Sequence, residues 1–308
     1  MMSEKIVDCI VIGGGPAGLS AALVLGRSRR TVLVIDGNQP RNSVTRESHG
    51  FLSRDGIQPE EFKQISLEQL KKYPNVQYHQ DFVERVVKQD HGFKAATAKG
   101  NVYKSRKVIL ATGMKDHLPP IQGLQEVYGT SVFPCPYCDG WERRDARFAV
   151  FGNEEWLMHY VKMIYHWSHD LILFTNGPAA LTSAEKKDLV DHHIQLVESP
   201  IVKLQSTDGQ LERVVVESGE SFERTDGFIL DTGETQASDI PSQLGIPLNE
   251  MGGCIVDEHG ETSIKGLYVI GDAKHVFSGL IMAASEGYEL GATINGEMVI
   301  EDWERTKG

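Results

Sequence analysis

Residues 6–18 read IVDCIVIGGGPAG, and this stretch decides the fold. Its first half is almost entirely apolar and rich in β-branched side chains, which is typical of a strand buried on both faces. A glycine-rich turn follows at residues 13–18, and the small residues of 19–27 predict a helix. A second apolar strand at residues 31–35 ends on Asp36. The sequence therefore predicts a complete strand–helix–strand unit within about thirty residues.

The spacing Gly13-x-Gly15-x-x-Gly18 in this setting is typical of a dinucleotide-binding loop. Glycine permits the tight turn, lets backbone N–H groups approach a pyrophosphate and allows the helix to pack closely on the strand. The amino terminus of the helix adds partial positive charge for the phosphates. Asp36 can accept hydrogen bonds from a ribose. The motif does not distinguish FAD from NAD, and a glycine-rich turn without a ligand is the alternative.

Composition argues against several classes of function. The 308 residues include 31 Lys and Arg against 43 Asp and Glu, a net charge of −12, which argues against nucleic acid as the main partner. No apolar run reaches the roughly 18 residues of a membrane-spanning helix. The amino terminus lacks the apolar core and the cleavage site of a secretory signal. We therefore expect a soluble, cytoplasmic protein that binds neither nucleic acid nor membrane.

Two of the four cysteines form the motif Cys135-Pro136-Tyr137-Cys138. No second cysteine pair and no His-x-x-x-His motif completes a zinc site, so we expect no bound metal. In a reducing compartment the motif favours a redox dithiol whose thiolate pKa is lowered. A half-used metal site or a chance match is the alternative. Cys9 and Cys254 are interpreted as structural thiols.

The rest of the chain indicates a second strand–helix–strand unit. Residues 37–58 predict a long polar loop. Farther on, strand patterns at residues 148–151 and 171–174 flank a helical pattern at 154–167. A final long helix is predicted from about residue 278 to 303. Two such units suggest two related nucleotide-type folds.

Four motifs in this order resemble the low-molecular-weight thioredoxin reductase family of flavoproteins. They are IVIGGGPAGLSAA from residue 10, LATG from 110, CPYCDG from 135 and YVIGDA from 268. The resemblance spans nearly the whole chain and implies FAD in the first loop and a homodimer. Carried over residue by residue, the residues that contact FAD would be Gly13, Gly15, Pro16, Ala17, Gly18, Asp36, Asn42, Val83, Thr112, Gly113, Gly271, Asp272 and Leu280.

The resemblance also assigns roles around the cysteines. It implies that Cys138 faces the flavin and that Cys135 meets the substrate. Asp139 would move a proton to or from a thiol, although an Asp-Gly pair is also a common turn. The last helix would direct its N–H groups at the flavin and stabilise negative charge on it. One departure lies there, because the chain has Ser278-Gly279 where the family usually has Arg-Gln.

These motifs define the predicted fold class and its domains. We predict an α/β protein with two Rossmann-like, dinucleotide-type domains, each in three layers (ββα/βαβ). The FAD-binding domain is discontinuous and takes residues 1–117 and 240–308. Residues 118–239 form an inserted module that is similar to a NAD(P)H domain and carries the cysteine pair.

The second module departs from the family pattern at its nucleotide loop. Residues 151–156 read FGNEEW, with one glycine, two carboxylates where phosphates would lie, and a bulky tryptophan. Residues 175–178, after the next strand, contain no Arg or Lys to pair with a phosphate. NADPH is therefore doubtful as a cofactor. Binding of NADPH through a degenerate site is the alternative.

Another stretch resembles a side branch of the family, the gliotoxin-oxidase-like dithiol oxidases. Arg41-Asn42 and SHGFLSRDG at residues 48–56 carry this resemblance, and His159 and Trp167 also fit it. It implies oxidation of small dithiols to disulfides, with electrons passed to oxygen and without NADPH. Other relatives that lack the NADPH motif draw electrons from ferredoxin or another donor. His49 could lie near the flavin and accept a proton, or it could be a structural loop histidine.

We therefore predict an FAD-dependent enzyme, similar to thioredoxin reductase, that exchanges electrons between flavin and a dithiol or disulfide through Cys135 and Cys138. We expect it to work without NADPH and to use oxygen or another electron partner. The substrate is a small molecule or a thioredoxin-like protein. The alternatives are an NADPH-dependent thioredoxin-disulfide reductase and a non-catalytic flavin redox sensor. Asp139 favours an enzyme, because a sensor needs no proton shuttle.

Overall fold

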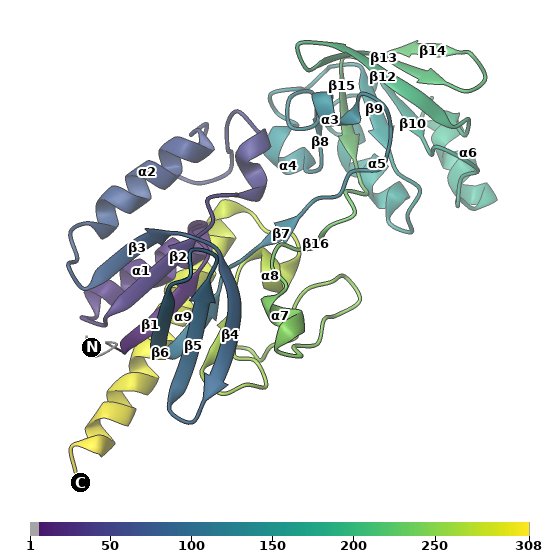
Figure 1. The fold of residues 1–308 in the computed structure, drawn as a ribbon. Helices are drawn as coiled ribbons and strands as arrows, with labels where there is room; N and C mark the ends of the chain where they lie inside the picture. The colour runs from purple at the N-terminus through teal and green to yellow at the C-terminus, as the bar shows by residue number, and fades with distance from the viewer. Residues whose placement is uncertain (1–5, 308) are drawn as a thin grey trace. The chain divides into compact units, whose positions relative to one another are not determined.

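The computed structural model describes residues 6–307, and the chain divides into two compact units (Figure 1). The first unit takes the chain up to residue 43, residues 50–115 and the chain from residue 235. The second unit takes residues 44–49 and 116–234. Each unit is an α/β structure of the predicted class. Within residues 6–307, no helix combines the length and the apolar character needed to cross a membrane.

A seven-stranded sheet forms the centre of the first unit. Strands β3, β2, β1, β6 and β17 pair in parallel, and β5 and β4 continue the sheet from β6 as an antiparallel extension. The strands are β1 (Val7–Ile12), β2 (Val32–Asp36), β3 (Val76–Gln80), β4 (Val83–Gln89), β5 (Gly92–Thr97), β6 (Val102–Leu110) and β17 (Leu267–Val269), with the separate pair β7 (Met114–Lys115) and β16 (Thr235–Gln236). The helices are α1 (Pro16–Arg27), η1 (Arg41–Val44), α2 (Pro59–Leu70), α7 (Ile240–Gln243), α8 (Asp272–His275) and α9 (Leu280–Arg305).

Strand β1 explains why the opening sequence is apolar at almost every position. Cys9 and Val11 face one side of the sheet and pack with α1 and α9. Ile10 and Ile12 face the other side and pack with β4, β5 and α7. The strand is therefore buried on both faces, as predicted.

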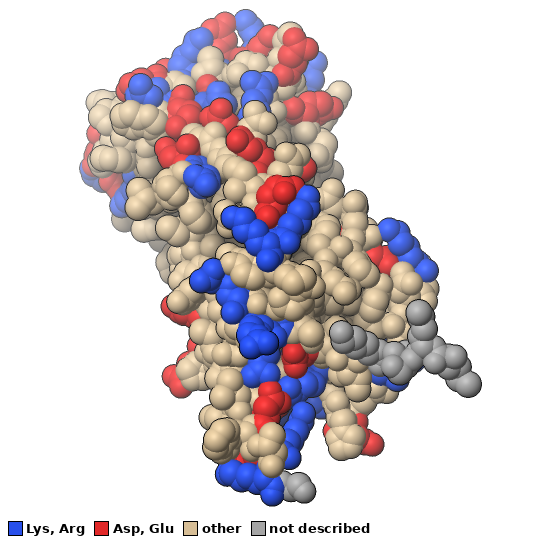
Figure 2. Space-filling view, turned by 90° about the vertical axis from the view of Figure 1, so that its left-hand side faces the viewer, with Lys and Arg blue, Asp and Glu red and all other residues tan. Residues whose placement is uncertain are grey.

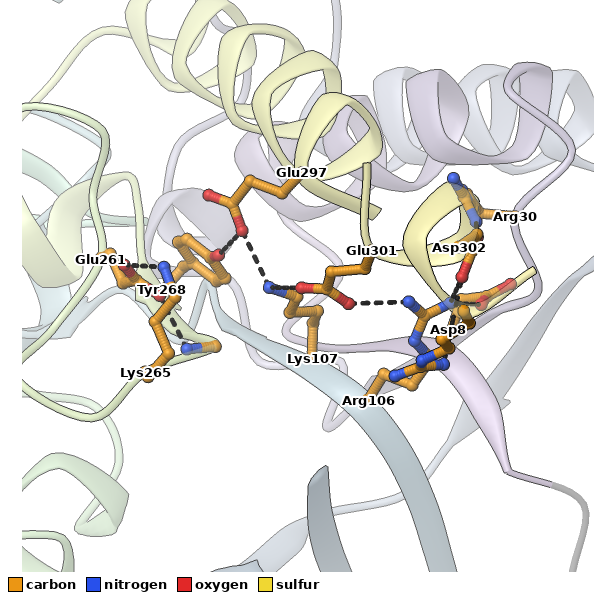
Figure 3. A network of polar contacts seen from close by, with 12 residues as sticks. Asp8, Arg30, Arg106, Lys107, Glu261, Lys265, Tyr268, Glu297, Glu301 and Asp302 are labelled. Atoms are coloured by element: carbon orange, nitrogen blue, oxygen red, sulfur yellow. Dashed lines mark hydrogen bonds and ion pairs between the residues drawn. The ribbon is translucent and has the colours of Figure 1, made fainter. Parts of the chain in front are cut away.

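Charged side chains as well as apolar packing hold α9 on the sheet (Figure 3). Lys107 on β6 is buried, and its ammonium group lies 2.8 Å from Glu297 and 3.0 Å from Glu301. Arg106 lies 2.7 Å from the same Glu301. The hydroxyl of Tyr268 donates to Glu297 at 2.6 Å. A charged group is stable in the protein interior only where it is paired. This network therefore holds the C-terminal half of α9 on the sheet.

The second unit repeats the layered plan with a five-stranded parallel sheet. Helices cover one face and an antiparallel three-stranded sheet covers the other. In spatial order the parallel strands are β11 (Gln195–Val197), β10 (Leu171–Phe174), β9 (Phe148–Phe151), β15 (Asp226–Ile229) and β8 (Val132–Phe133). The remaining elements are β12 (Ile201–Thr207), β13 (Gln210–Val216), β14 (Ser221–Glu223), α3 (Leu124–Val127), α4 (Pro136–Asp139), α5 (Leu157–Tyr165) and α6 (Ser183–Asp191).

Three helices begin at residues other than those predicted from the sequence. Helix α1 begins at Pro16 rather than at residue 19, because proline suits the first helical position. Helix α5 covers only Leu157–Tyr165, so Glu154 and Glu155 precede it. Helix α9 begins at Leu280, after the N-cap residue Gly279.

On the face drawn in Figure 2, Lys and Arg side chains lie among Asp and Glu side chains.

Candidate functional site

The first candidate site is the glycine-rich turn that joins β1 to α1. Gly13 has a φ of +109°, and a Cβ atom there would lie 2.1 Å from the backbone oxygen of Ala111. A Cβ atom on Gly18 would lie 2.1 Å from the backbone oxygen of Gly13. Around Gly15, by contrast, an added Cβ atom would meet nothing within 4 Å. The turn is therefore tightly packed on one side and open at Gly15, as the approach of a pyrophosphate requires.

The amino terminus of α1 adjoins this open space. Pro16 occupies the start of the helix, and no side chain caps its first turn. The first turn also contains no acidic residue, so the positive end of the helix dipole remains available to phosphate. Ala17 lies against Gly271, where an added Cβ atom would be 3.2 Å from the Cβ atom of Ala17. The YVIGDA motif thus meets the glycine-rich turn directly.

Asp36 lies at the end of β2, next to the same turn. A Cβ atom on Gly14 would be 2.5 Å from Oδ2 of Asp36. That oxygen accepts hydrogen bonds from Lys63 at 2.5 Å and from the hydroxyl of Tyr78 at 2.8 Å. Burial raises the pKa of Asp36, but the bonds from Lys63 and Tyr78 outweigh it and hold this pKa below its usual value. The carboxylate is therefore ionised and held in place, as a ribose acceptor should be.

The LATG motif ends β6 beside the turn. The hydroxyl oxygen of Thr112 is buried and has no hydrogen-bond partner within residues 6–307. Gly113 has a φ of +70°, and a Cβ atom there would meet nothing within 4 Å. Buried hydroxyls without a partner are uncommon in folded proteins. A ligand bound at this position would supply the missing partner.

Asp272 begins α8 and is held inside the protein. Its Oδ1 accepts from the backbone N–H of Ser278 at 3.0 Å and from the Ser278 hydroxyl at 2.7 Å. Its Oδ2 lies 3.4 Å from the guanidinium of Arg41. Burial raises the pKa of Asp272, and the contacts with Ser278 and Arg41 offset only part of that rise. The serine at the departure from the family pattern therefore serves as a partner of Asp272.

The remaining predicted cofactor residues lie on neighbouring segments of the first unit. Asn42 is in η1, and Leu280 is the first residue of α9. Val83 begins β4, shortly after Asp81, whose N–H donates to the backbone oxygen of Asp36 at 3.1 Å. The structure thus brings together the glycine-rich turn, the end of β2, the LATG motif and the start of α8.

The second candidate site is a disulfide between Cys135 and Cys138 in the second unit. Cys135 is the N-cap of the short helix α4, and the N–H of Cys138 donates to its sulfur at 3.2 Å. Tyr137 stands between the cysteines with 74% of its surface exposed. The hydroxyl of Tyr160 donates to the backbone oxygen of Pro134 at 2.9 Å and anchors the residue before the motif. Both sulfur atoms belong to half-buried residues, beside an exposed aromatic ring.

Asp139 follows the disulfide and has a strongly shifted pKa. Burial raises the pKa of Asp139 to about 7, although the charges of His49 and Arg143 oppose the rise, and Glu142 adds to it. At neutral pH this carboxyl group can therefore give or take a proton. His49 belongs to the same unit, and its Nε2 lies 3.7 Å from carboxylate oxygens of Glu47 and Glu142. The structure thus brings His49 to the acid that follows the cysteine pair.

Comparison with known proteins identifies the family. Residues 7–291 match the model of the pyridine nucleotide-disulphide oxidoreductases. The chain belongs to this family. It is 40% identical to a putative thioredoxin reductase, TrxB, from Bacillus anthracis, whose crystal structure superimposes with a TM-score of 0.92 over 96% of this chain and 99% of that one.

Two further relatives support the assignment to the pyridine nucleotide-disulphide oxidoreductases. A probable thioredoxin reductase of Arthroderma benhamiae is 33% identical, over 88% of this chain and 75% of its own length. HlmI is 28% identical in sequence to this chain. Its crystal structure superimposes with a TM-score of 0.91 over 99% of this chain and 96% of that one. The protein is therefore a flavin-dependent disulfide oxidoreductase, and family membership implies FAD as its cofactor.

The first unit of this pyridine nucleotide-disulphide oxidoreductase fits FAD. The open space at Gly15 and the uncapped start of α1 suit a pyrophosphate. Asp36 provides an ionised acceptor for a ribose. The unpartnered hydroxyl of Thr112 provides a donor or acceptor for another part of the cofactor. Polar groups of the right kinds therefore surround an open glycine loop.

The second glycine loop of this pyridine nucleotide-disulphide oxidoreductase has a different structure. The side chain of Asn153, after β9, donates to the backbone oxygen of Pro178 at 2.9 Å and accepts from the N–H of Ala180 at 2.8 Å. It therefore bridges the ends of β9 and β10, where a dinucleotide would bind in a fold of this kind. Glu154 and Glu155 are exposed, and Trp156 is the N-cap of α5. This loop carries no glycine after Gly152 and no basic residue.

Several functional contacts were not predicted from the sequence. Lys63 and Tyr78 hold Asp36, yet they come from α2 and β3, far along the chain. Glu286 of α9 accepts from the N–H of Gly271 at 2.7 Å and from Lys274 at 2.9 Å. No local pattern marks these residues. Among residues 6–307, no group of His, Cys, Asp and Glu side chains is arranged to hold a metal ion.

Proposed function

We propose that this disulfide oxidoreductase oxidises dithiols at the Cys135–Cys138 disulfide and does so without NADPH. The observation that carries the proposal is the side chain of Asn153, whose hydrogen bonds join the loops after β9 and β10. In folds of this kind a dinucleotide binds at these strand ends. The exposed carboxylates of Glu154 and Glu155 would repel the phosphates of that dinucleotide.

The loop after β10 supports the same conclusion. Thr175 donates its hydroxyl to the backbone oxygen of Gly177 at 2.7 Å, and Asn176 accepts from the N–H of Ile201 at 2.7 Å. Both side chains are therefore engaged within the protein. No Arg or Lys lies between residues 150 and 161 or between 171 and 185, so these segments offer no cationic side chain to pair with a ribose phosphate.

The chemistry follows from thiol–disulfide exchange. A substrate thiolate attacks the sulfur of Cys135, a mixed disulfide forms, and Cys138 leaves as a thiolate. The second substrate thiol, losing its proton to Asp139, then attacks the mixed disulfide and releases Cys135. The substrate leaves as a disulfide, and its two electrons remain on the cysteine pair. One proton is then on Asp139, and the other went to solvent when the first substrate thiol ionised. We propose that His49 assists by stabilising the carboxylate of Asp139 and by accepting a proton in turn.

Bound FAD would supply a two-electron sink for the reduced cysteine pair, with oxygen as the final electron acceptor and hydrogen peroxide as the product. We propose that the cofactor is held by the predicted set, from the glycine-rich turn to Leu280. Within that set, the start of α1 binds the pyrophosphate and Asp36 binds the ribose. The substrate is a small dithiol or the dithiol of a thioredoxin-like protein.

We propose in addition that two copies of the chain associate through α9. Large apolar side chains recur at helical spacing along one side of this helix and are exposed: Ile281, Tyr288, Val299 and Trp303. An exposed apolar stripe of this length suits a second copy of the same surface. Analytical ultracentrifugation tests this, and a mass of 34.2 kDa at micromolar concentration would contradict it.

The proposed reaction is tested by anaerobic reduction of the bound flavin, followed by its absorbance. We expect excess NADPH to leave the yellow colour unchanged, excess dithiothreitol to bleach it, and admitted air to restore it with release of peroxide. Rapid bleaching by NADPH would contradict the proposal and establish an ordinary thioredoxin reductase. The variant Cys138→Ser should resist bleaching by the dithiol. Cys254→Ala, which removes a buried thiol outside the motif, is the matched control.

A further inference from the structure

The connection between α8 and α9 contains an unusual backbone conformation. Val276 has a φ of +69° and a ψ of −49°. A β-branched residue at positive φ is a clear outlier, because its side chain collides with the backbone there. These angles lie near the strained γ-turn conformation. Val276 is also buried, so the strain is imposed by its surroundings.

One side chain from a distant part of the sequence holds this connection. Arg41, in η1, donates from its guanidinium to the backbone oxygen of Val276 at 2.8 Å. The same nitrogen lies 3.4 Å from Oδ2 of Asp272, the first residue of α8. The guanidinium also lies over the ring of Phe277, 4.9 Å from its centre. A planar guanidinium suits this combination of a carbonyl, a carboxylate and an aromatic face.

A second contact joins the end of the connection that precedes α9 to the carboxylate of Asp272. Ser278 donates its backbone N–H and its hydroxyl to Asp272. The four residues from Val276 to Gly279 are thereby fixed at both ends. Gly279 is the N-cap of α9, and an added Cβ atom there would meet nothing within 4 Å. The clamped connection therefore determines where α9 starts, beside an open space.

We propose that Arg41 is a positioning residue for FAD, which acts by holding Val276 in its strained conformation and so placing the start of α9. The inference rests on the proposed cofactor site, in which Asp272 and Leu280, on either side of the connection, both contact FAD. Arg41 acts through the backbone of the connection and not through its charge alone. When Arg41 is removed, the connection relaxes toward negative φ and the start of α9 shifts.

The test compares FAD release from the wild type and from Arg41→Ala, followed by the fluorescence of free flavin after dilution. We expect release from the variant to be roughly tenfold to a hundredfold faster, as for the loss of a hydrogen bond with a charged donor. Arg27→Ala is the matched control, because Arg27 lies at the other end of α1 and donates to Tyr73. Far-ultraviolet circular dichroism checks that each variant is folded.

Val276→Gly distinguishes positioning from a simple effect of charge. Glycine adopts positive φ without strain, so removing Arg41 should accelerate FAD release much less in the Val276→Gly background than in the wild type. Equal acceleration in both backgrounds would overturn the inference, and so would an unchanged release rate in Arg41→Ala. A wild-type protein that binds no FAD would instead contradict the proposed function itself.

Discussion

The two strand–helix–strand units of this chain share a topology but differ at the ends of their strands. In the first unit, the turn after β1 is open at Gly15 and adjoins an ionised Asp36. In the second unit, the turn after β9 is bridged by Asn153. Both sheets are nevertheless parallel at this point and buried on both faces. The fold depends on the apolar layers, whereas ligand chemistry depends on a few residues at the strand ends.

The two turns also differ in whether their polar groups have hydrogen-bond partners inside the protein. In the first unit, the hydroxyl oxygen of Thr112 has no hydrogen-bond partner within residues 6–307, and a bound cofactor would provide one. In the second unit, the side chain of Asn153 is already hydrogen-bonded to the backbone of Pro178 and Ala180. A closed loop of this kind is stable without a ligand. We therefore expect equivalent substitutions in the two loops to have very different effects.

The largest effect is expected from Gly13→Ala, compared with Gly152→Ala at the matching place in the second unit. At Gly13 the added Cβ meets backbone 2.1 Å away, at a φ of +109°, which should cost at least about 3 kcal/mol and abolish FAD binding. At Gly152 the nearest atom is the Cβ of Leu230 at 3.0 Å, so the cost should stay near 1 kcal/mol. Flavin content after purification and urea unfolding measure both. Full flavin content in Gly13→Ala would break the comparison.

The first unit was predictable because its determinants are local. The buried strand at residues 6–12, the glycine spacing and the terminal Asp36 lie within one short stretch, and each has a physical meaning that can be read directly. The cysteine pair and the missing basic residues of the second loop are local patterns too. The starts of α1 and α9 differ from the prediction by three and two residues. Helix α1 begins at Pro16, because proline suits the first helical position, and α9 begins after Gly279.

The remaining features arise from contacts between residues far apart in sequence. Lys63 reaches Asp36, and Arg41 reaches the turn at Val276, yet the sequence around neither residue indicates these contacts. The long polar loop was predicted, but not that its residues 44–49 would join the second unit. This placement brings His49 to Glu142 rather than leaving it in the first unit. Such contacts depend on tertiary packing, for which a single sequence contains no periodic signal.

An intermediate effect is expected from Asp139→Asn, which tests the thiol chemistry proposed for the second unit. With a pKa of about 7, Asp139 should make dithiol-driven flavin reduction rise with pH through neutrality. The variant should lose this rise and react about a hundredfold more slowly. Asp145→Asn, nearby and exposed, should behave as the wild type. A retained pH profile in Asp139→Asn would assign the titration to another group.

The same substitution has a second signature with the opposite sign. Because the folded state raises the pKa of Asp139, the folded protein binds this proton more tightly than the unfolded chain does. The contribution of Asp139 to stability therefore falls as pH rises from its ordinary pKa through about 7. Asp139→Asn should remove this loss and be more stable than the wild type at pH 8. Thermal unfolding at pH 5 and pH 8 measures it, and equal shifts at both pH values would exclude a burial effect.

The smallest effect is expected from Asn153→Ala, which removes the bridge between β9 and β10. Two surface hydrogen bonds are lost and water replaces part of them, so the cost should be about 1 kcal/mol. Glu154→Ala, at the next residue, should cost less, because the exposed side chain of Glu154 makes no hydrogen bond within residues 6–307. Three of the four tryptophans lie in the second unit, at residues 141, 156 and 167, so tryptophan fluorescence during urea unfolding reports mainly on this unit. Flavin content should not change, since the residues proposed to hold the cofactor belong to the first unit. If Asn153→Ala also began to accept electrons from NADPH, the side chain alone would be blocking a functional crevice, and the missing basic residues would not matter.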